Sequence, residues 1–485
     1  MQWEKDKMIS TISHRQCTPH EGLNSQIPMI FDMDNYLLNG RSLIIKNNLS
    51  ADQQDLLEQG SVYIFDHKVP TEKNKVRYLR ATIKGIMKNS PYKVMGINGK
   101  QNSNGKALIF DKNLSFSGCC VDTVKINSKE AFFVQTTSNL AVVLPSNSKL
   151  MVIGKNYFLQ SKSLESFKIG DRIAVMKRLP TGNADNLSVE KARFLMLMLG
   201  DGHVTKRRNR IFITSSDSEI LENFSELTQK IYGKKAKILK PNAELNSVKV
   251  CAELANLGFM SKDKYATGVP SEILQSGEEI LFSTLGALID TDGNIFEKKG
   301  QIRVDTASYS IALDIATLFL KIGLFPTINR TKTTFGVRAQ IYGRVAKRIS
   351  DYVISKRKKQ NLLSIKDPKK SLECELLSIE GTELAFLRKS NLDTLDSLSK
   401  KIGVNPKLIN NWEKNKRKVQ IKKLQQIAEI YDNQNLLNLV SSPITTVKIK
   451  DIEKINFDQG KDFIMPKTEE MFISNLILTK GDFYG

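Results

Sequence analysis

Two apolar runs that each close on Asp-Gly decide the organisation of this chain: Phe194-Leu-Met-Leu-Met-Leu-Gly-Asp201-Gly202 and Leu285-Gly-Ala-Leu-Ile-Asp-Thr-Asp292-Gly293. An apolar run of this length, closed by an acid, predicts a buried helix with a carboxylate at its end. Because the run occurs twice, 91 residues apart, we expect the two helices to pair. The pairing would place Asp201 and Asp292 side by side.

Small residues within and beside the runs are interpreted as the surfaces that let the two helices approach closely. They are Gly200, Gly202, Gly286, Ala287 and Gly293. The alternative is a pair of ordinary core helices that happen to end in Asp-Gly, and the second copy of the run makes this alternative weaker.

Two carboxylates at paired helix ends suit the metal-dependent cleavage of a phosphodiester. Divalent metals supply a nucleophilic water, neutralise a phosphate oxygen and stabilise the leaving alkoxide. Mg²⁺ is satisfied by one or two carboxylates, with water and phosphate as its other ligands. Asp201 and Asp292 are therefore the candidate catalytic and metal-binding residues, with Mg²⁺ or Mn²⁺ as the cofactor.

The composition favours a polyanionic partner. Lys and Arg outnumber Asp and Glu by 73 to 51, which gives a net charge of +22, although a generally lysine-rich proteome would have the same effect. No apolar run reaches the ~18 residues of a membrane span, and the first residues lack the apolar core of a signal peptide. We expect a cytoplasmic protein, or a nuclear one in a eukaryotic host, with no membrane association.

The pattern along the chain predicts a multidomain α+β protein. Alternating runs rich in Val, Ile and Phe predict an all-β part before the first motif, and helix and strand alternate twice around the two motifs. The expected boundaries are an N-terminal region of unknown role (1–60), a β domain (61–185), two fused repeats (186–275 and 276–365), a helical domain (385–440) and terminal strands (441–485).

Both Asp-Gly runs resemble the LAGLIDADG (dodecapeptide) motif of homing endonucleases. The resemblance implies a pseudo-dimeric core in which an αββαββα unit occurs twice in residues 186–365, acting as a monomer on double-stranded DNA. The metal-binding acid of the family precedes the final Gly, which corresponds to Asp201 and Asp292. Asp290 has Leu199 as its counterpart and is left out of the site, and Met196 stands where the family usually has a small residue.

The family also places a basic residue from each half near the scissile phosphates. Lys264 lies in Ser261-Lys-Asp-Lys-Tyr-Ala-Thr-Gly-Val-Pro270, which resembles the family's Lys-x-x-Pro segment, and is the candidate catalytic lysine. Its counterpart is expected within 356–359 and is not assigned to one residue. Lys206, Arg207 and Arg208 are expected DNA contacts. Exposed basic residues in a lysine-rich chain are the alternative for Lys264 and its counterpart.

The flanks resemble the Hint fold of inteins, in segments 133–147, 164–175, 451–455, 463–466 and 471–481. Splicing needs a histidine in the first segment and a terminal His-Asn pair, where this chain has Asn147 and Lys480-Gly481. The histidines of the chain, which are His14, His20, His67 and His203, lie outside these segments. Cys119 or Cys120 is either a relic nucleophile or a packed thiol. We therefore expect an intein-derived protein that does not splice.

Residues 395–418 resemble a Cro/repressor-type helix-turn-helix. Gly403 suits the turn and Asn405 the cap of the second helix, whereas Leu398, Ile402, Leu408 and Ile409 are spaced to pack the two helices together. The expected DNA-binding residues of the second helix are Lys407, Asn410 and Asn411. The alternative is a small helical bundle with a solvated basic face.

The sequence thus predicts a site-specific endonuclease that makes a double-strand break at a long DNA site. Two rivals remain open. One is a non-catalytic transcriptional regulator, because some bacterial regulators join a silent LAGLIDADG fold to a helix-turn-helix. The other is an active intein, which the placement of the histidines disfavours.

Overall fold

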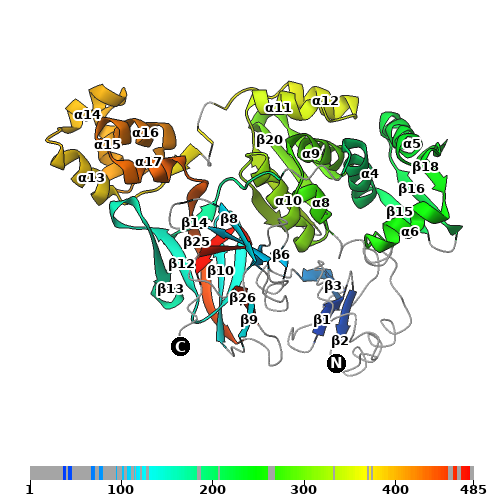
Figure 1. The fold of residues 1–485 in the computed structure, drawn as a ribbon, viewed down its shortest axis with the longest axis horizontal. Helices are drawn as coiled ribbons and strands as arrows, with labels where there is room; N and C mark the ends of the chain where they lie inside the picture. The colour runs from blue at the N-terminus through cyan, green and yellow to red at the C-terminus, as the bar shows by residue number, and fades with distance from the viewer. Residues whose placement is uncertain are drawn as a thin grey trace.

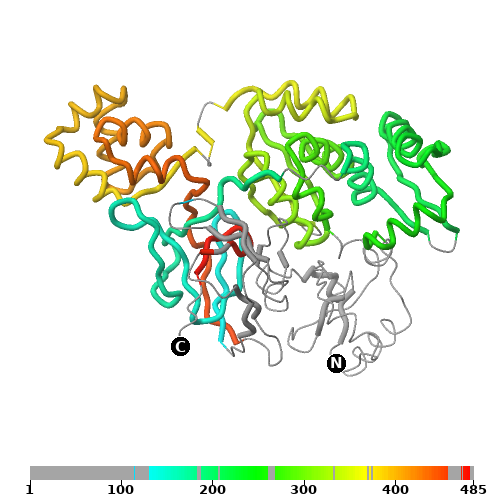
Figure 2. The backbone as a smooth tube through the Cα atoms, viewed as in Figure 1, coloured from blue at the N-terminus to red at the C-terminus, as the bar shows by residue number. Residues whose placement is uncertain are grey.

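The computed structural model describes residues 130–182, 187–205, 208–259, 268–330, 334–368, 371–372, 375–456 and 471–480, together with Leu114 and the backbone of short strands within 36–126 and 463–466 (Figure 2). Within this part of the chain, no helix is both long and apolar enough to cross a membrane. The fold has three parts, namely a helix-centred core, a β part and a helical part (Figure 1).

Two buried helices form the centre of the core. Helix α4 (Val189–Gly200) begins at Ser188, whose side chain accepts a hydrogen bond from the Lys191 N–H. Helix α9 (Glu278–Asp292) is buried along most of its length, from Ile280 to Asp290. The two helices lie side by side, with a four-stranded sheet beyond each of them (Figure 1). This is the pairing that the repeated apolar runs predict.

Each helix opens a repeat with the same order of elements. The first repeat continues through β15 (Gly202–Thr205), β16 (Arg210–Thr214), α5 (Ser218–Tyr232), β17 (Lys237–Leu239), β18 (Asn242–Asn246) and α6 (Val248–Asn256). The second continues through β19 (Gly293–Phe296), β20 (Gln301–Thr306), α10 (Tyr309–Lys321), β21 (Thr327–Arg330), β22 (Phe335–Gln340) and α11 (Gly343–Ser350). Their sheets have equivalent strand orders, β15-β16-β18-β17 and β19-β20-β22-β21. The short helix α8 (Ser271–Leu274) precedes α9, and α12 (Lys356–Leu363) follows the second repeat.

The β part takes its strands from both ends of the chain. Its ten-stranded sheet includes a path of order β11-β10-β25-β14-β28-β27-β7-β8. The strands are β7 (Lys106–Phe110), β8 (Phe116–Cys120), β10 (Glu130–Thr136), β11 (Ala141–Pro145), β12 (Lys149–Ile153), β13 (Leu159–Ser163), β14 (Arg172–Met176), β25 (Ile444–Asn456), β27 (Met471–Ser474) and β28 (Ile477–Lys480). Strand β25 pairs with β10 on one side and β14 on the other. The segments before and after the core therefore complete a single sheet.

The remaining described strands form two-stranded ladders. They are β1 (Tyr36–Asn39) with β2 (Ser42–Ile45), β3 (His67–Pro70) with β4 (Val76–Leu79), β5 (Val94–Met95) with β6 (Gln101–Asn102), and β9 (Thr123–Ile126) with β26 (Phe463–Pro466). The rest of the expected N-terminal region, 1–60, lies outside the described residues.

The helical part has its own apolar core. It consists of α13 (Gly381–Ser390), α14 (Leu395–Ile402), α15 (Pro406–Glu413), α16 (Ile421–Ile430) and α17 (Gln434–Ser441), with β23 (Leu376–Leu377) paired to β24 (Val419–Gln420). A buried ion pair between Arg388 and Glu413, with Nε and Oε1 2.7 Å apart, joins α13 to the end of α15. This part lies beside the β12–β13 hairpin (Figure 1).

Candidate active site

The two predicted acids lie where α4 and α9 end. Asp201 is the C-cap residue of α4 and Asp292 is the last residue of α9, and both are half-buried. A Cβ atom placed on Gly200 would lie 2.6 Å from Cβ of Thr291 and 2.9 Å from Oδ2 of Asp292. The carboxylate of Asp292 is therefore packed against the residue that precedes Asp201, which brings the two acids to one place.

The other three glycines of the predicted set, Gly202, Gly286 and Gly293, have their nearest contacts elsewhere than at the opposite helix. A Cβ on Gly286 would lie 2.7 Å from the carbonyl carbon of Tyr352, which belongs to the segment before α12 and not to α4. Similar atoms on Gly202 and Gly293 would meet the preceding turn of their own helices. These two glycines allow the chain to leave each helix sharply, so Gly200 is the glycine that the helix contact requires.

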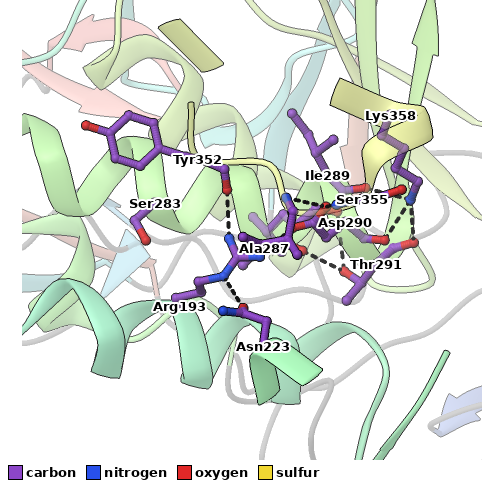
Figure 3. Close-up of polar contacts among 12 residues, drawn as sticks. Arg193, Asn223, Ser283, Ala287, Ile289, Asp290, Thr291, Tyr352, Ser355 and Lys358 are labelled. Atoms are coloured by element: carbon purple, nitrogen blue, oxygen red, sulfur yellow. Dashed lines mark hydrogen bonds and ion pairs between the residues drawn. The ribbon is translucent and has the colours of Figure 1, made fainter. Parts of the chain in front are cut away.

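Asp290 is held in a buried structural network. Arg193 of α4 forms an ion pair with Asp290 across the helix interface, and the side chains are 8% and 0% exposed. The same carboxylate accepts hydrogen bonds from the N–H groups of Ile354, at 3.0 Å, and Ser355, at 2.9 Å. Figure 3 shows Arg193 reaching further, to Asn223 and to the carbonyl of Tyr352. These contacts agree with leaving Asp290 out of the metal site.

Lys358 closes the end of α9. Its Nζ atom donates to the carbonyl oxygens of Ile289 and Asp290, at 2.7 Å each, and of Thr291, at 3.2 Å (Figure 3). A cation at this position satisfies the last carbonyls of the helix and opposes their negative dipole. Burial lowers the pKa of Lys358, whereas the charges of Asp290 and Asp201 act to raise it.

A polar hollow of about 390 Å³ adjoins the end of α9. Its lining consists of Thr291, Asp292, Gly293, Asn294, Ile295, Asp305, Arg357, Lys358 and Asn361. Asp305 is balanced by Arg303, whose Nε donates to it at 2.8 Å. Within the segment 356–359, Arg357 and Lys358 line this hollow together with Asp292. Arg357 is exposed and Lys358 is buried. Lys356 instead forms an exposed ion pair with Glu219, at 3.4 Å.

The donor set fits a hard divalent cation. One acid from each of the two helices lies at this place. An oxygen site with few protein ligands leaves positions for water and phosphate, as Mg²⁺ requires. Among the described residues, no group of three or more His, Cys, Asp and Glu side chains could hold a metal ion. Asp201 and Asp292, at the ends of the two paired helices, are residues that could hold such an ion.

A polar sheet face begins directly at each acid. In the second repeat, strand register places Asn294, Arg303, Arg338 and Thr327 in one row across the sheet, while the alternate residues are largely buried. In the first repeat, His203, Phe212, Glu244 and Lys237 form the equivalent row. The His203 and Phe212 rings stack with centroids 4.9 Å apart. The two faces offer polar and aromatic groups on both sides of the acids.

The other predicted basic residues are only partly described. Arg208 is exposed on the turn between β15 and β16. Lys206 and Arg207, which precede it, and Lys264, the candidate catalytic lysine, lie outside the described residues.

The helix-turn-helix segment has the local geometry that its sequence predicts. Gly403 ends α14 in the left-handed region, with φ of 64°. Asn405 caps α15 by accepting a hydrogen bond from the Lys407 N–H at 2.8 Å. Lys407 is exposed and Asn410 and Asn411 are half-buried, so the predicted contact residues reach the surface of α15.

The predicted relic splicing positions lie close together. Asn147 is exposed in the turn before β12, and Lys149 of β12 is paired in register with Lys480 of β28. Gly481 lies outside the described residues, as do the side chains of Cys119 and Cys120 in β8. The pairing of β12 with β28 thus brings Asn147 near the last expected Hint segment.

The Arg193–Asp290 pair and the cap formed by Lys358 were not predicted from the sequence. A signal for the pair was present, because one arginine and one extra aspartate lie within the apolar stretches of the two helices. Charged residues in such runs are almost never buried unless they are paired. No comparable local signal marked Lys358 among its basic neighbours.

Comparison with known families identifies two domains in the chain. The profile of the LAGLIDADG-like domain matches residues 188–263 and 279–365, and that of a helix-turn-helix matches 384–433. The chain therefore contains a LAGLIDADG-like domain in two segments and a helix-turn-helix, as the two resemblances predict. The matched segments include both acids and the whole of α14 and α15.

Similar curated proteins have several different names. One is the replication factor C small subunit of Methanocaldococcus jannaschii, 27% identical over 50% of this chain and 13% of that protein. An A-type ATP synthase subunit of Pyrococcus abyssi is 28% identical over 34% of this chain and 18% of that protein. The replicative DNA helicase DnaB of Rhodothermus marinus is 25% identical over 34% and 19%. The chain spans less than a fifth of these relatives.

Two solved structures are also similar. Mesophilic variants of the homing endonuclease I-DmoI align with 35% of this chain and 98% of their own, at 16% identity and a TM-score of 0.28. Full-length DUF199/WhiA from Thermatoga maritima aligns with 55% of this chain and 93% of its own, at 9% identity and a TM-score of 0.26.

Proposed function

We propose that this chain is a site-specific DNA endonuclease that makes a metal-dependent double-strand break. The observation that supports this function best is the packing of the Asp292 carboxylate against Gly200, beside Asp201, at the ends of two paired helices. A protein that only binds DNA gains nothing from two acids placed between its DNA-facing sheets, because they repel phosphate.

Asp201 and Asp292 are the proposed metal ligands, one from each repeat. A bound Mg²⁺ or Mn²⁺ would activate water and neutralise charge on the phosphate. The protein's own contribution is to fix the two carboxylates. Gly200 allows the close contact at Asp292, and Lys358 stabilises the helix end from which Asp292 projects.

The basic residues around the acids are proposed to orient the DNA backbone. Arg357 is exposed in the hollow beside Asp292 and is the proposed phosphate contact of the second half. Lys264 keeps its predicted role as the catalytic lysine of the first half. Lys206, Arg207 and Arg208 would contact the backbone nearby, and α15 would enter a groove of the same duplex through Lys407, Asn410 and Asn411.

An intein origin agrees with the pattern of relatives. Segments of this chain are similar to small parts of proteins with different names, which is expected of an element that inserts into different hosts. We propose that the β part is a degenerate Hint domain without splicing activity, because Asn147 and Lys480 cannot replace histidine as proton donors near neutral pH. The enzyme would act as a monomer in the cytoplasm, or in the nucleus of a eukaryotic host.

The test is cleavage by acid-to-amide variants. The purified chain is incubated with a random DNA library and Mg²⁺, and sequencing of the new ends identifies the target. Asp201→Asn and Asp292→Asn should abolish cleavage of this target while binding stays within a few-fold, because each change removes a metal ligand and no phosphate contact. Asp351→Asn, at the exposed end of α11, is the matched control and should cleave normally.

The same experiment tests the alternative, a non-catalytic regulator with a LAGLIDADG fold and a helix-turn-helix. A regulator would bind duplexes from the library without producing ends at any Mg²⁺ or Mn²⁺ concentration. Cleavage that persists in both acid variants would instead show that the active site lies elsewhere.

A further inference from the structure

The helical part is built onto the β part rather than tethered to it. Tyr157 and Ile153, from the β12–β13 hairpin, are 4% and 8% exposed, and both lie in the apolar core of helices α13–α17. The hairpin thus supplies core residues to a domain that begins more than two hundred positions later in the chain.

Hydrogen bonds add to this apolar contact at several points. The N–H of Asn156 donates to Oε2 of Glu383 at 2.9 Å. Oγ1 of Thr445 donates to the carbonyl of Leu376 at 3.1 Å, and the N–H of Ser378 donates to Oγ1 of Thr446 at 3.3 Å. In addition, α17 ends at Ser441 and β25 begins at Ile444, so almost no chain separates the last helix from the central strand.

The β part is also joined to the second repeat. The N–H of Ile328 donates to the carbonyl of Ser138 at 3.1 Å, and the N–H of Leu179 donates to the carbonyl of Leu320 at 3.2 Å. Nζ of Lys321 donates to the carbonyl of Pro180 at 2.6 Å. Residues of the β sheet and of both repeats belong to one continuous apolar core.

We propose that the β part is a rigid spacer, which holds α15 at a fixed distance and rotation from the two acids. The proposal rests on the proposed DNA-binding function and adds a property of the substrate. The DNA target would have two parts, one under the core and one under the helix-turn-helix, with an invariant number of base pairs between them. A flexibly tethered domain would instead accept many spacings, because its effective concentration changes slowly with linker extension.

The experiment changes the spacing in the DNA. A duplex selected from a random library with the full chain is footprinted, and its two protected parts are then separated by roughly 5 bp, half a helical turn, or roughly 10 bp, a full turn. Affinity is measured by titration at fixed salt without divalent metal, so the result does not depend on cleavage. The reference is the triple variant Lys407→Ala/Asn410→Ala/Asn411→Ala, which lacks the α15 contacts.

Rigid spacing predicts that both insertions weaken binding at least tenfold, to the level of the triple variant on the parent duplex. The full-turn insertion also fails, because it moves the second part by about 34 Å even though it restores the rotation. If both insertions bind like the parent duplex while the triple variant is weak, the domain is tethered and the proposal is wrong. If the triple variant binds the parent duplex normally, α15 does not read DNA, which overturns this proposal and that part of the proposed function but not the nuclease.

Loosening the attachment provides a second test. Tyr157→Ala removes a core residue of the hairpin contact, and Phe158→Ala, at the adjacent residue with 53% exposure, is the control. Tyr157→Ala should bind the parent duplex more weakly and should lose less than the wild type when the spacing changes. The fluorescence of the buried Trp412 verifies that the helical part stays folded. An unchanged dependence on spacing in Tyr157→Ala would contradict the role of the hairpin.

Discussion

Asp290→Asn is expected to destabilise the core strongly, because it leaves a buried guanidinium without its counter-ion. Asp290 is fully buried and Arg193 is 8% exposed, and the carboxylate also accepts two backbone N–H groups. Removing one partner of a buried ion pair costs about 3 to 5 kcal/mol. In a folding unit of roughly 150 to 250 residues, such as the two repeats together, a loss of this free energy of unfolding lowers the melting temperature by roughly 6 to 20 °C.

The measurement is calorimetry of the full chain, supported by hydrogen exchange of the α9 amides. Tryptophan fluorescence is unsuitable, because Trp412 reports on the helical part, where it is buried, and Trp3 lies outside the described residues. Glu278→Gln is the matched control on the same helix. This change breaks the ion pair between Glu278 and Arg348, whose side chains are 51% and 48% exposed, respectively. It should lower the free energy of unfolding by less than about 1 kcal/mol.

A double variant tests whether the unpaired charge of Arg193 causes the loss of stability. Arg193→Met/Asp290→Asn should be more stable than Asp290→Asn, because it removes the orphaned charge and keeps an acceptor for the N–H groups of Ile354 and Ser355. Two single losses that add without coupling would refute the argument, as would a loss below about 1 kcal/mol for Asp290→Asn.

Three further results are expected. Gly200→Ala should reduce cleavage far more than DNA affinity, measured on the same selected duplex, because its methyl group would displace Asp292. Lys401 and Ser397 lower the pKa of Asp393 from 3.8 to about 2, so its ionised form stabilises the fold fully above pH 3.8, and this stabilisation is lost as the pH falls toward 2. Asp393→Asn should therefore remove this acid-dependent loss of stability, which is measured by the fluorescence of Trp412. Burial lowers the pKa of Lys321 from 10.5 to about 8, so keeping this lysine charged in the folded state costs stability at pH 7. Lys321→Met should therefore be more stable than the wild type at pH 7. The difference in melting temperature should shrink from pH 8 to 10, where the lysine loses its charge.

The first two results have control variants, and the third has an outcome that would contradict it. Gly277→Ala, at the start of α9, meets only an ordinary contact at 3.9 Å and should leave cleavage unchanged. Asp396→Asn, which alters another acid near Asp393, in α14, is the control for Asp393→Asn and should show the same loss of stability at low pH as the wild type. For Lys321, a melting-temperature difference that stays constant with pH would show that its charge does not affect stability.

The sequence predicted the paired helices and the two repeats because the deciding signals were local and occurred twice. An apolar run that closes on an acid and glycine was sufficient to place Asp201 and Asp292 at paired helix ends. The helix-turn-helix was predictable for the same reason, since Gly403 and Asn405 act on their immediate neighbours.

The contacts that the sequence did not predict join distant positions. Arg193 and Asp290 are 97 residues apart, and their pairing depends on how α4 and α9 are rotated. The role of Gly286 was misassigned because helical periodicity does not reveal which neighbour a face meets, and here that neighbour is Tyr352. The attachment of the helical part depends on Tyr157, whose burial has no local signal in a short hairpin.

The position of β25 has a consequence for synthesis on the ribosome. Strands β10 and β14 emerge early, but β25, which lies between them, emerges only after the core and the helical part have been made. Until β25 is made, the edges of β10 and β14 that pair with it have unsatisfied hydrogen-bonding groups. Such exposed edges promote association with other chains. Translation that stops before Ile444 should therefore yield a chain whose β sheet is incomplete and prone to aggregation.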